Sequence, residues 1–542
     1  MPFAKTGGLA DVCGSLPIEL SNLGHDPIVF LPAYRQVAQC GQEIKFTDID
    51  LEIPIGTRTI RKTVRGRLLK STLPASDVPV YLVEQNEYFD RPELYTQDGV
   101  DYEDNCERFV FFCRAVLESI RLLKLSVDLV HCNDWQTGLL PVYLKTEYID
   151  QRGYEEIASL LTIHNLAYQG SFWHWDMQLT GIDWKYYNWQ QMECHQRLNL
   201  LKSGIVFADS INTVSPTYAQ EIQKPPLGCG LQEVLKHRSD VLSGIINGVD
   251  YQVWNPDTDP VIAKNYNASK LKGGKAKCKA ALQREMGLPE EPAVPLIGLI
   301  SRLADQKGWH LITEVMQRWA VDKNVQWVIL GTGQPEYHKM LADLAAKHPD
   351  RVATSLTFSD ALAHRIEAGA DMFVMASQYE PCGLNQLYSL QYGTVPIVRE
   401  TGGLADSIVD ATEENLKTKT ANGFRFKSFD ASSLDLALTR AYDVYREDRK
   451  VWKQLMRTGM RQDWSWTNSA KQYLALYETT VDRRKSYTPT SIPAHKNHAR
   501  VKTRLRHGAL GGHRREPRRS ALRISTGAAG AIGAALPVLC RK

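Results

Sequence analysis

Residues 296–308 read Leu-Ile-Gly-Leu-Ile-Ser-Arg-Leu-Ala-Asp-Gln-Lys-Gly, an apolar run followed at once by a polar turn. The run at 296–300 is typical of a buried parallel strand. The turn after it carries Arg302 and Lys307. Because ligands of open α/β sheets bind beyond the carboxyl ends of the strands, this stretch predicts a doubly wound domain whose ligand meets two cations.

The same alternation of apolar runs and amphipathic stretches continues along most of the chain, and it predicts parallel βαβ units. One series of expected strands lies at 28–31, 80–83, 129–132, 160–163 and 211–214, and a second at 296–300, 327–330, 372–375 and 395–398. Two series predict an α/β protein of two Rossmann-like domains. The boundary is expected within 247–295, where turn residues concentrate.

Five of the expected strands are followed by polar or glycine-rich turns. These turns occupy 133–138, 164–170, 301–308, 331–333 and 380–386. Since the carboxyl ends of parallel strands share one edge of a sheet, the turns predict a common ligand-binding crevice.

Composition indicates an ordinary globular protein, with 43% hydrophobic and 23% charged residues among 542. The net charge of +4 is unevenly placed, because from Ser486 onward 12 Lys and Arg stand against the single acid Glu516, which leaves −7 for the rest. A mildly acidic body predicts neither nucleic acid nor a membrane surface as partner. Ten scattered cysteines predict reduced thiols and no zinc site. We expect the basic tail, 481–542, to be a disordered extension foreign to the fold, with a basic interaction arm as the alternative.

The hexapeptide Thr-Gly-Gly-Leu-Ala-Asp occurs twice, at Thr6–Asp11 and at Thr401–Asp406. Each copy predicts a glycine-rich turn that opens a helix, one in each domain. A doubly wound domain should begin with a strand before its first such turn, and only five residues precede Thr6. We therefore predict that the first sheet lacks a strand and that the protein is less stable for it.

Eight strings in this chain resemble bacterial glycogen synthases and plant starch synthases. They are Pro-Phe-Ala-Lys-Thr-Gly-Gly-Leu-Ala-Asp-Val at 2–12, Asp-Trp-Gln-Thr-Gly at 134–138, Thr-Ile-His-Asn at 162–165, Thr-Val-Ser-Pro-Thr-Tyr at 213–218, Asn-Gly-Val-Asp at 247–250, Ser-Arg-Leu with Gln-Lys-Gly at 301–308, Glu-Pro-Cys-Gly-Leu-Asn-Gln at 380–386 and Tyr-Gly-Thr-Val-Pro-Ile-Val at 392–398. The motifs stand in family order from Pro2 to about Glu478. The resemblance implies the GT-B arrangement: two Rossmann-like doubly wound parallel-sheet domains, 1–250 and 251–480, facing across a cleft, with the last helix crossing back to the first domain.

The resemblance also implies a retaining transfer of glucose from ADP-glucose to the non-reducing 4-hydroxyl of glycogen or another α-1,4-glucan. It implies no metal or other cofactor and places the protein in the bacterial cytoplasm or a plastid. Departure of a nucleoside diphosphate leaves negative charge on the β-phosphate, which fixed cations stabilise. The family gives this role to Arg302 and Lys307, places Glu380 on the donor hexose, and sets His164 near the anomeric carbon.

Further binding residues are carried over by their motif positions. Those expected at the donor are Lys5, Gly7, Gly8, Asn247, Phe358, Cys382, Gly383, Leu384 and Thr401, and those expected on the acceptor side are Asp11, Tyr95, Asn105 and Trp135. Lys5 would contact the diphosphate or sugar, Asn247 the glucose, and Phe358 would stack on adenine. Three of these residues keep a structural alternative: Asp11 as a first-turn helix acid, Phe358 as a core aromatic and Cys382 as a packing residue.

Two other functions remain open from the sequence. One is a GT-B transferase of another family that uses UDP-glucose, against which Tyr388 and the 5–11 motif argue. The other is a catalytically impaired glucan-binding homologue. The presence of Arg302, Lys307, Glu380 and His164 opposes that reading on chemical grounds.

Overall fold

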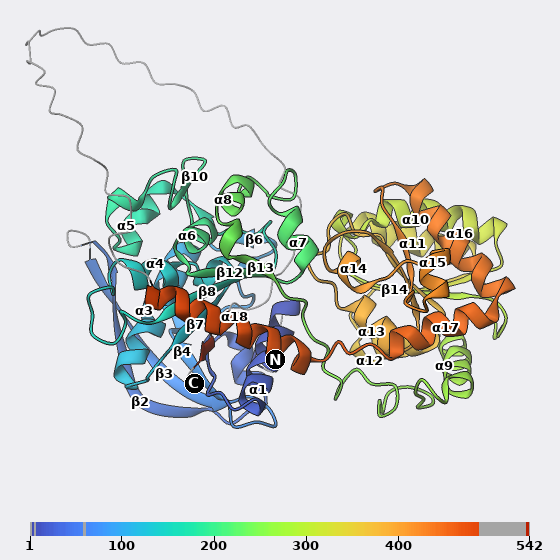
Figure 1. The fold of residues 1–542 in the computed structure, drawn as a ribbon, viewed down its shortest axis with the longest axis horizontal. Coiled ribbons are helices and arrows are strands. Elements are labelled where there is room, and N and C mark those ends of the chain that lie inside the picture. The colour runs from blue at the N-terminus through green and yellow to red at the C-terminus, as the bar shows by residue number, and fades with distance from the viewer. Residues whose placement is uncertain (1–2, 5–6, 58–60, 487–537, 541–542) are drawn as a thin grey trace, which may run out of the picture.

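The computed structural model describes residues 3–4, 7–57, 61–486 and 538–540, which form two α/β lobes (Figure 1). Each lobe has its own hydrophobic core, so the two-domain prediction is confirmed. No helix among the described residues combines the length and the apolar character that a membrane crossing requires.

The second lobe is a six-stranded parallel sheet in the order β16-β15-β14-β17-β18-β19. Its strands are β14 (Leu296–Ile300), β15 (Gln326–Leu330), β16 (Val352–Ser355), β17 (Met372–Met375), β18 (Val395–Arg399) and β19 (Phe424–Phe426). Its helices are α9 (Leu271–Glu285), α10 (Trp309–Asp322), α11 (Pro335–Lys347), α12 (Asp360–Gly369), α13 (Asn385–Gln391), α14 (Gly402–Ser407), α15 (Glu413–Lys417), α16 (Ala431–Glu447) and α17 (Arg449–Met460). All four expected strands are confirmed, and the short edge strands β16 and β19 were missed because neither forms a long apolar run.

The first lobe is a nine-stranded sheet in the order β13-β12-β8-β7-β20-β1-β4-β3-β2. The five expected strands are β1 (Ile28–Pro32), β4 (Pro79–Glu84), β7 (Leu129–Asn133), β8 (Ala158–Ile163) and β12 (Ser210–Thr213), which are joined by β13 (Leu242–Gly244) and the antiparallel pair β2 (Lys45–Gly56) and β3 (Arg61–Thr72). Its helices include α1 (Gly8–Asn22), α3 (Asn105–Leu122), α4 (Leu139–Lys145), α6 (Leu200–Phe207), α7 (Pro216–Glu221) and α8 (Gln232–His237).

The strand β20 (Val538–Cys540) lies between β1 and β7, at the centre of the first sheet. It runs antiparallel to both, with Leu539 opposite Ile28 on one side and opposite Val130 on the other. The expectation of a disordered tail is therefore wrong for these three residues, and the place expected to lack a strand holds this one. β1 and β7 flank this place, and their buried backbone N–H and C=O groups need hydrogen-bond partners, which a strand between them supplies. Residues 487–537 of the tail lie outside the described part of the chain.

Deleting residues 487–542 is expected to lower the thermal midpoint by several degrees, because β1 and β7 would each expose a buried hydrogen-bonding edge. Differential scanning calorimetry of the full chain and of the chain ending at Ser486 tests this. Removal of Arg541 and Lys542 alone, which leaves β20 in place, serves as the control. Equal midpoints for the full and the shortened chain would contradict a stabilising role for β20.

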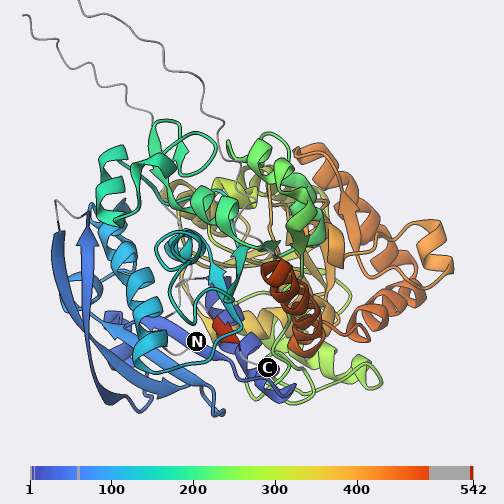
Figure 2. The same ribbon diagram turned by 60° about the vertical axis from the view of Figure 1, so that its left-hand side comes forward.

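The last long helix, α18 (Trp466–Ser486), starts in the part of the sequence assigned to the second domain and packs against the first sheet (Figures 1 and 2). Tyr473 accepts a hydrogen bond from Asn212 at 3.1 Å, and the Tyr477 hydroxyl lies 2.8 Å from Nδ1 of His131. The predicted crossing of the last helix back to the first domain is thus confirmed.

Candidate functional site

The predicted cation and carboxylate of the second lobe meet directly. Lys307 follows β14 and Glu380 follows β17, which is the strand next to β14 in the sheet. Lys307 Nζ lies 2.6 Å from Glu380 Oε2, and Ser377 donates to the same oxygen at 2.8 Å. Both charged side chains are largely buried, so the pair is held in one geometry beyond the carboxyl ends of two adjacent strands.

Arg302 is tied to the same turn through Gln306. Its guanidinium donates to Gln306 Oε1 at 3.4 Å, and Gln306 Nε2 donates to the carbonyl of Tyr379 at 3.2 Å. Arg302 is exposed and forms no ion pair with any residue that the structure describes. A guanidinium without an ion-pair partner, close to the turn that carries Glu380, is suited to bind an anion. The sequence did not predict that Gln306 links Arg302 to this turn.

The Glu380–Leu384 turn also contacts Asn247, which lies at the end of the sequence assigned to the first domain. Asn247 is buried, and its Oδ1 has no hydrogen-bond partner among the described residues. A buried acceptor without a partner is costly and marks a place for a ligand donor. Cys382 hydrogen-bonds to the backbone of Asn247, and burial raises the pKa of its thiol to about 12. Cys382 therefore stays a thiol, in line with a lining rather than a nucleophilic role. Gly383 takes a φ of 68°, which favours glycine in this turn.

His164 lies at the carboxyl end of β8 in the first lobe. Its Nε2 is 2.9 Å from Asn133 Oδ1, so Nε2 carries the proton and Nδ1 is left as an acceptor. Burial lowers the pKa of His164 to about 3, which keeps the ring neutral at physiological pH. The neighbouring Asn165 side chain hydrogen-bonds to Tyr379 of the second lobe. This contact brings His164 toward the turn that carries Glu380.

Asp134 is a site residue that the sequence reasoning passed over, although its turn was noted. It follows β7 with φ 54° and ψ −169°, a backbone conformation that costs a non-glycine residue free energy. Oδ1 accepts from the His164 backbone N–H at 2.8 Å, while Oδ2 is buried without a partner among the described residues. Burial raises the pKa of Asp134 from 3.8 to about 7. A strained, partly unsatisfied carboxyl that fixes His164 is typical of a functional site.

The glycine-rich turn of the first lobe faces the second lobe. Gly7, with a φ of 136°, precedes α1, and a Cβ placed on Gly8 would lie 3.8 Å from Cδ1 of Leu384. This glycine-rich turn therefore lies beside the Glu380–Leu384 turn, and its contact with the donor stays a prediction. Asp11 lies in the first turn of α1, and its two readings stay open. Lys5 lies outside the described residues.

Three of the four residues expected on the acceptor side, Tyr95, Asn105 and Trp135, lie together in the first lobe. The Asn105 amide donates to the Tyr95 carbonyl at 2.9 Å, and the rings of Tyr95 and Trp135 are 6.0 Å apart. Asn105 is only 1% exposed, and its Oδ1 accepts from Arg108 at 2.6 Å. Direct sugar contact by Asn105 is thereby disfavoured, and its amide instead fixes the backbone of Tyr95. For Tyr95 and Trp135 the acceptor role stays a prediction.

Phe358 and Thr401 have opposite surroundings. Phe358, just before the N-cap of α12, is 82% exposed, which rules out the core-aromatic alternative and leaves a ring free to stack. Thr401 is buried, and its hydroxyl donates to Glu221 of the first lobe at 2.9 Å. The hydroxyl is therefore engaged between the lobes and is not free for a substrate.

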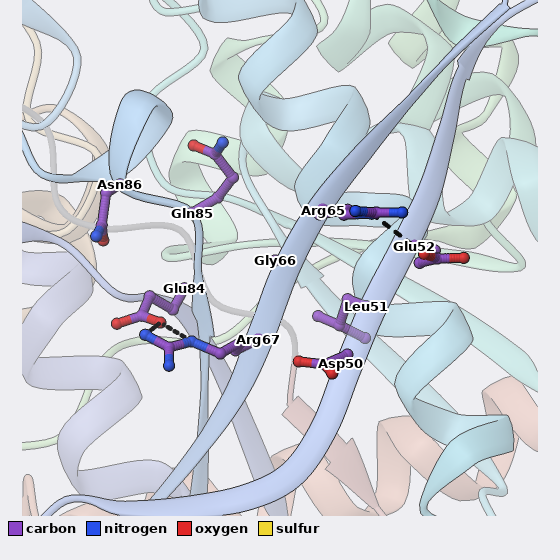
Figure 3. A pocket seen from close by; sticks show the side chains of 9 residues that line it. All are labelled: Asp50, Leu51, Glu52, Arg65, Gly66, Arg67, Glu84, Gln85 and Asn86. Atoms are coloured by element: carbon purple, nitrogen blue, oxygen red, sulfur yellow. Dashed lines mark hydrogen bonds and ion pairs between the residues drawn. The ribbon is translucent and has the colours of Figure 1, made fainter.

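A separate hollow of about 390 Å³ lies on the outer hairpin of the first lobe, beside the end of β4 (Figure 3). Both of its arginines are paired with carboxylates: Arg65 lies 3.2 Å from Glu52, and Arg67 lies 2.6 Å from Glu84. The hollow therefore lacks an unpaired guanidinium such as that of Arg302.

Comparison with known proteins decides the family. The starch synthase catalytic domain matches residues 1–237, and glycosyl transferases group 1 match residues 283–457. A glycogen synthase of Rhodopirellula baltica is 48% identical over 490 residues, which cover 89% of this chain and 96% of that protein. The chain belongs to the glycogen synthase family.

Two further relatives support the assignment of this chain to the glycogen synthase family. A glycogen synthase of Thermosipho africanus is 42% identical over 484 residues, covering 89% of this chain and 98% of that protein. The catalytic domain of starch synthase IV from Arabidopsis thaliana, solved bound to ADP and acarbose, superposes with a TM-score of 0.77 at 33% identity, covering 89% of this chain and 97% of that one. The protein is therefore a glycosyltransferase of glycogen or starch synthesis, and the predicted GT-B class is confirmed.

Proposed function

We propose that the protein transfers glucose, with retention of configuration, from ADP-glucose to the non-reducing 4-hydroxyl of an α-1,4-glucan. The observation that carries the proposal is the Lys307–Glu380 ion pair at 2.6 Å, with Arg302 tied through Gln306 to the same turn. Such a set can hold a hexose and neutralise the diphosphate that leaves it. Because the two glycogen synthases compared above, which are 48% and 42% identical to this chain, are bacterial, we infer the bacterial cytoplasm as the place of the reaction.

In this mechanism the bond between the anomeric carbon and the β-phosphate oxygen breaks, and the acceptor oxygen bonds to that carbon from the same face. The proton of the acceptor hydroxyl passes to the departing diphosphate. Arg302 and Lys307 stabilise the negative charge on the departing diphosphate, and no metal is needed for that step. Glu380 holds the donor hexose through its hydroxyls. The Cys382 thiol, with its pKa near 12, is not the nucleophile.

The neutral His164 and the acceptor oxygen of Asn247 complete the sugar site in the proposal. His164 presents Nδ1 as an acceptor, since Nε2 is used by Asn133. Asn247 Oδ1 has no partner among the described residues and would accept from a glucose hydroxyl. Oriented acceptors of this kind fix the ring of the donor relative to the attacking hydroxyl.

Adenine specificity rests on Phe358, whose exposed ring could stack on the base. That the Arabidopsis relative was solved with ADP supports this choice of nucleotide.

We expect faster incorporation of labelled glucose into glycogen from ADP-glucose than from UDP-glucose. Phe358→Ala should raise KM for ADP-glucose several-fold, while KM for glycogen and the thermal midpoint stay unchanged. Equal rates from both donors would overturn the donor assignment, and no incorporation from either would favour an impaired homologue.

A further inference from the structure

The second copy of the repeated hexapeptide, Thr401–Asp406, begins a helix whose first amide is held by the other lobe. The backbone N–H of Gly402 donates to Glu221 Oε1 at 3.2 Å and to Oε2 at 3.1 Å, and Thr401 Oγ1 donates to Oε1 at 2.9 Å. Glu221 ends α7 of the first lobe. A carboxylate at a helix N-terminus is favoured by the free N–H groups and by the helix dipole.

The last residue of the same copy makes the reverse contact. Asp406 accepts hydrogen bonds from Ser215 Oγ, from Thr217 Oγ1 at 2.5 Å and from Thr217 N at 3.1 Å. Ser215 and Thr217 begin α7. Each of the two helices, α7 and α14, therefore places a carboxylate at the N-terminus of the other, and we call Glu221 and Asp406 with their partners the carboxylate clamp.

The clamp is continuous with the turn that carries Glu380. The Gly403 N–H donates to the carbonyls of Glu380 and Pro381, both at 3.1 Å. A Cβ on Gly402 would lie 2.0 Å from the Glu380 carbonyl oxygen, and one on Gly403 would lie 1.9 Å from that of Cys382. Only glycine allows so close an approach of the two backbones. The position of Glu380 thus depends on residues 401–403, which Glu221 of the first lobe holds through hydrogen bonds.

The first copy of the repeat also lies against this turn, where Gly8 faces Leu384. Both copies thus approach the 380–384 turn, although the clamp involves the second copy. Identical sequences have different partners because each copy meets a different element of the opposite lobe.

We propose that Glu221 and Asp406 are positioning residues that set Glu380, and hence the donor hexose, in register with His164 and the acceptor in the first lobe. This inference rests on the proposed function, in which Glu380 holds the donor sugar. Neither Glu221 nor Asp406 contacts the reacting atoms. The clamp acts on transfer between the lobes, whereas the residues proposed for the leaving diphosphate and for adenine, Arg302, Lys307 and Phe358, all belong to the second lobe.

The test measures kcat, the Kd for ADP and the thermal midpoint of Glu221→Ala, Asp406→Ala and the double variant. We expect kcat to fall roughly 10- to 100-fold, the loss that follows a small misplacement of reacting groups, with the Kd for ADP within twofold of the parent. The double variant should lose no more than the worse single variant, because both act on one clamp. Glu221→Gln, which keeps an acceptor oxygen for Thr401 and Gly402, should recover most of kcat.

Glu413→Ala is the matched control, because Glu413 is an exposed first-turn carboxylate of α15 in the same lobe, and it should behave as the parent. A kcat within twofold of the parent in Glu221→Ala, or an ADP affinity that falls as far as kcat, would overturn the proposal. If alanine prevents folding, Glu221→Asp, whose side chain is one methylene shorter and withdraws the carboxylate from Gly402, decides by the same two ratios. Absence of transfer by the parent protein would count against the proposed function itself, which separates the two failures.

Discussion

Arg302→Ala is expected to lower kcat by about two to four orders of magnitude with little change in the thermal midpoint. The guanidinium is exposed, and within the described part of the chain its hydrogen bond is the weak one to Gln306 at 3.4 Å, so the fold does not depend on it. Its effect falls on the transition state, where the leaving diphosphate gains charge. Initial rates of glucose transfer, with calorimetry on the same samples, measure both quantities.

Lys307→Ala separates the catalytic from the structural part of this prediction. A comparable loss of kcat is expected, and the midpoint should also fall, because Glu380 would keep a buried charge without its partner. Arg318→Ala is the control, since Arg318 lies on the surface of α10, the helix that follows the same turn. Near-parental activity in Arg302→Ala would refute the assignment of the donor site.

Asp134→Asn is expected to stabilise the protein at pH 8 while it lowers activity, as happens where a functional site holds an unfavourable group. Burial raises the pKa of Asp134 from 3.8 to about 7, a difference that corresponds to roughly 4 kcal/mol at most. Asparagine tolerates the positive φ and keeps an oxygen for the His164 N–H. It also replaces the oxygen that lacks a partner and removes the buried charge.

The sign of the pH dependence follows from the raised pKa. The folded protein binds the Asp134 proton more tightly than the unfolded chain does, so its contribution to stability is complete below pH 3.8 and is lost as pH rises through 7. The gain in thermal midpoint from Asp134→Asn should therefore widen between pH 5 and pH 7 and then level off. A gain that is constant with pH would contradict the buried, protonated carboxyl.

The local sequence determined where the strands run and which turns follow them. Apolar runs such as 296–300 and 372–375 coincide with β14 and β17, because a buried parallel strand requires a continuous apolar stretch whatever lies around it. The turns after them carry Arg302, Lys307 and Glu380, so the residues proposed for the donor site could be named from the family motifs to which they belong. The short edge strands and the β2–β3 hairpin were not predicted, because their sequences are partly polar and form no continuous apolar run.

Only the tertiary structure decided how these residues meet. Lys307 and Glu380 are 73 positions apart and pair because β14 and β17 are neighbours in the sheet. The raised pKa of Asp134 and the grip of Glu221 on Gly402 both depend on what packs around them. Burial and long-range partners arise when the elements pack, and no periodicity or local motif encodes them. The same holds for β20, whose three residues form a strand because β1 and β7 offer them two unpaired edges.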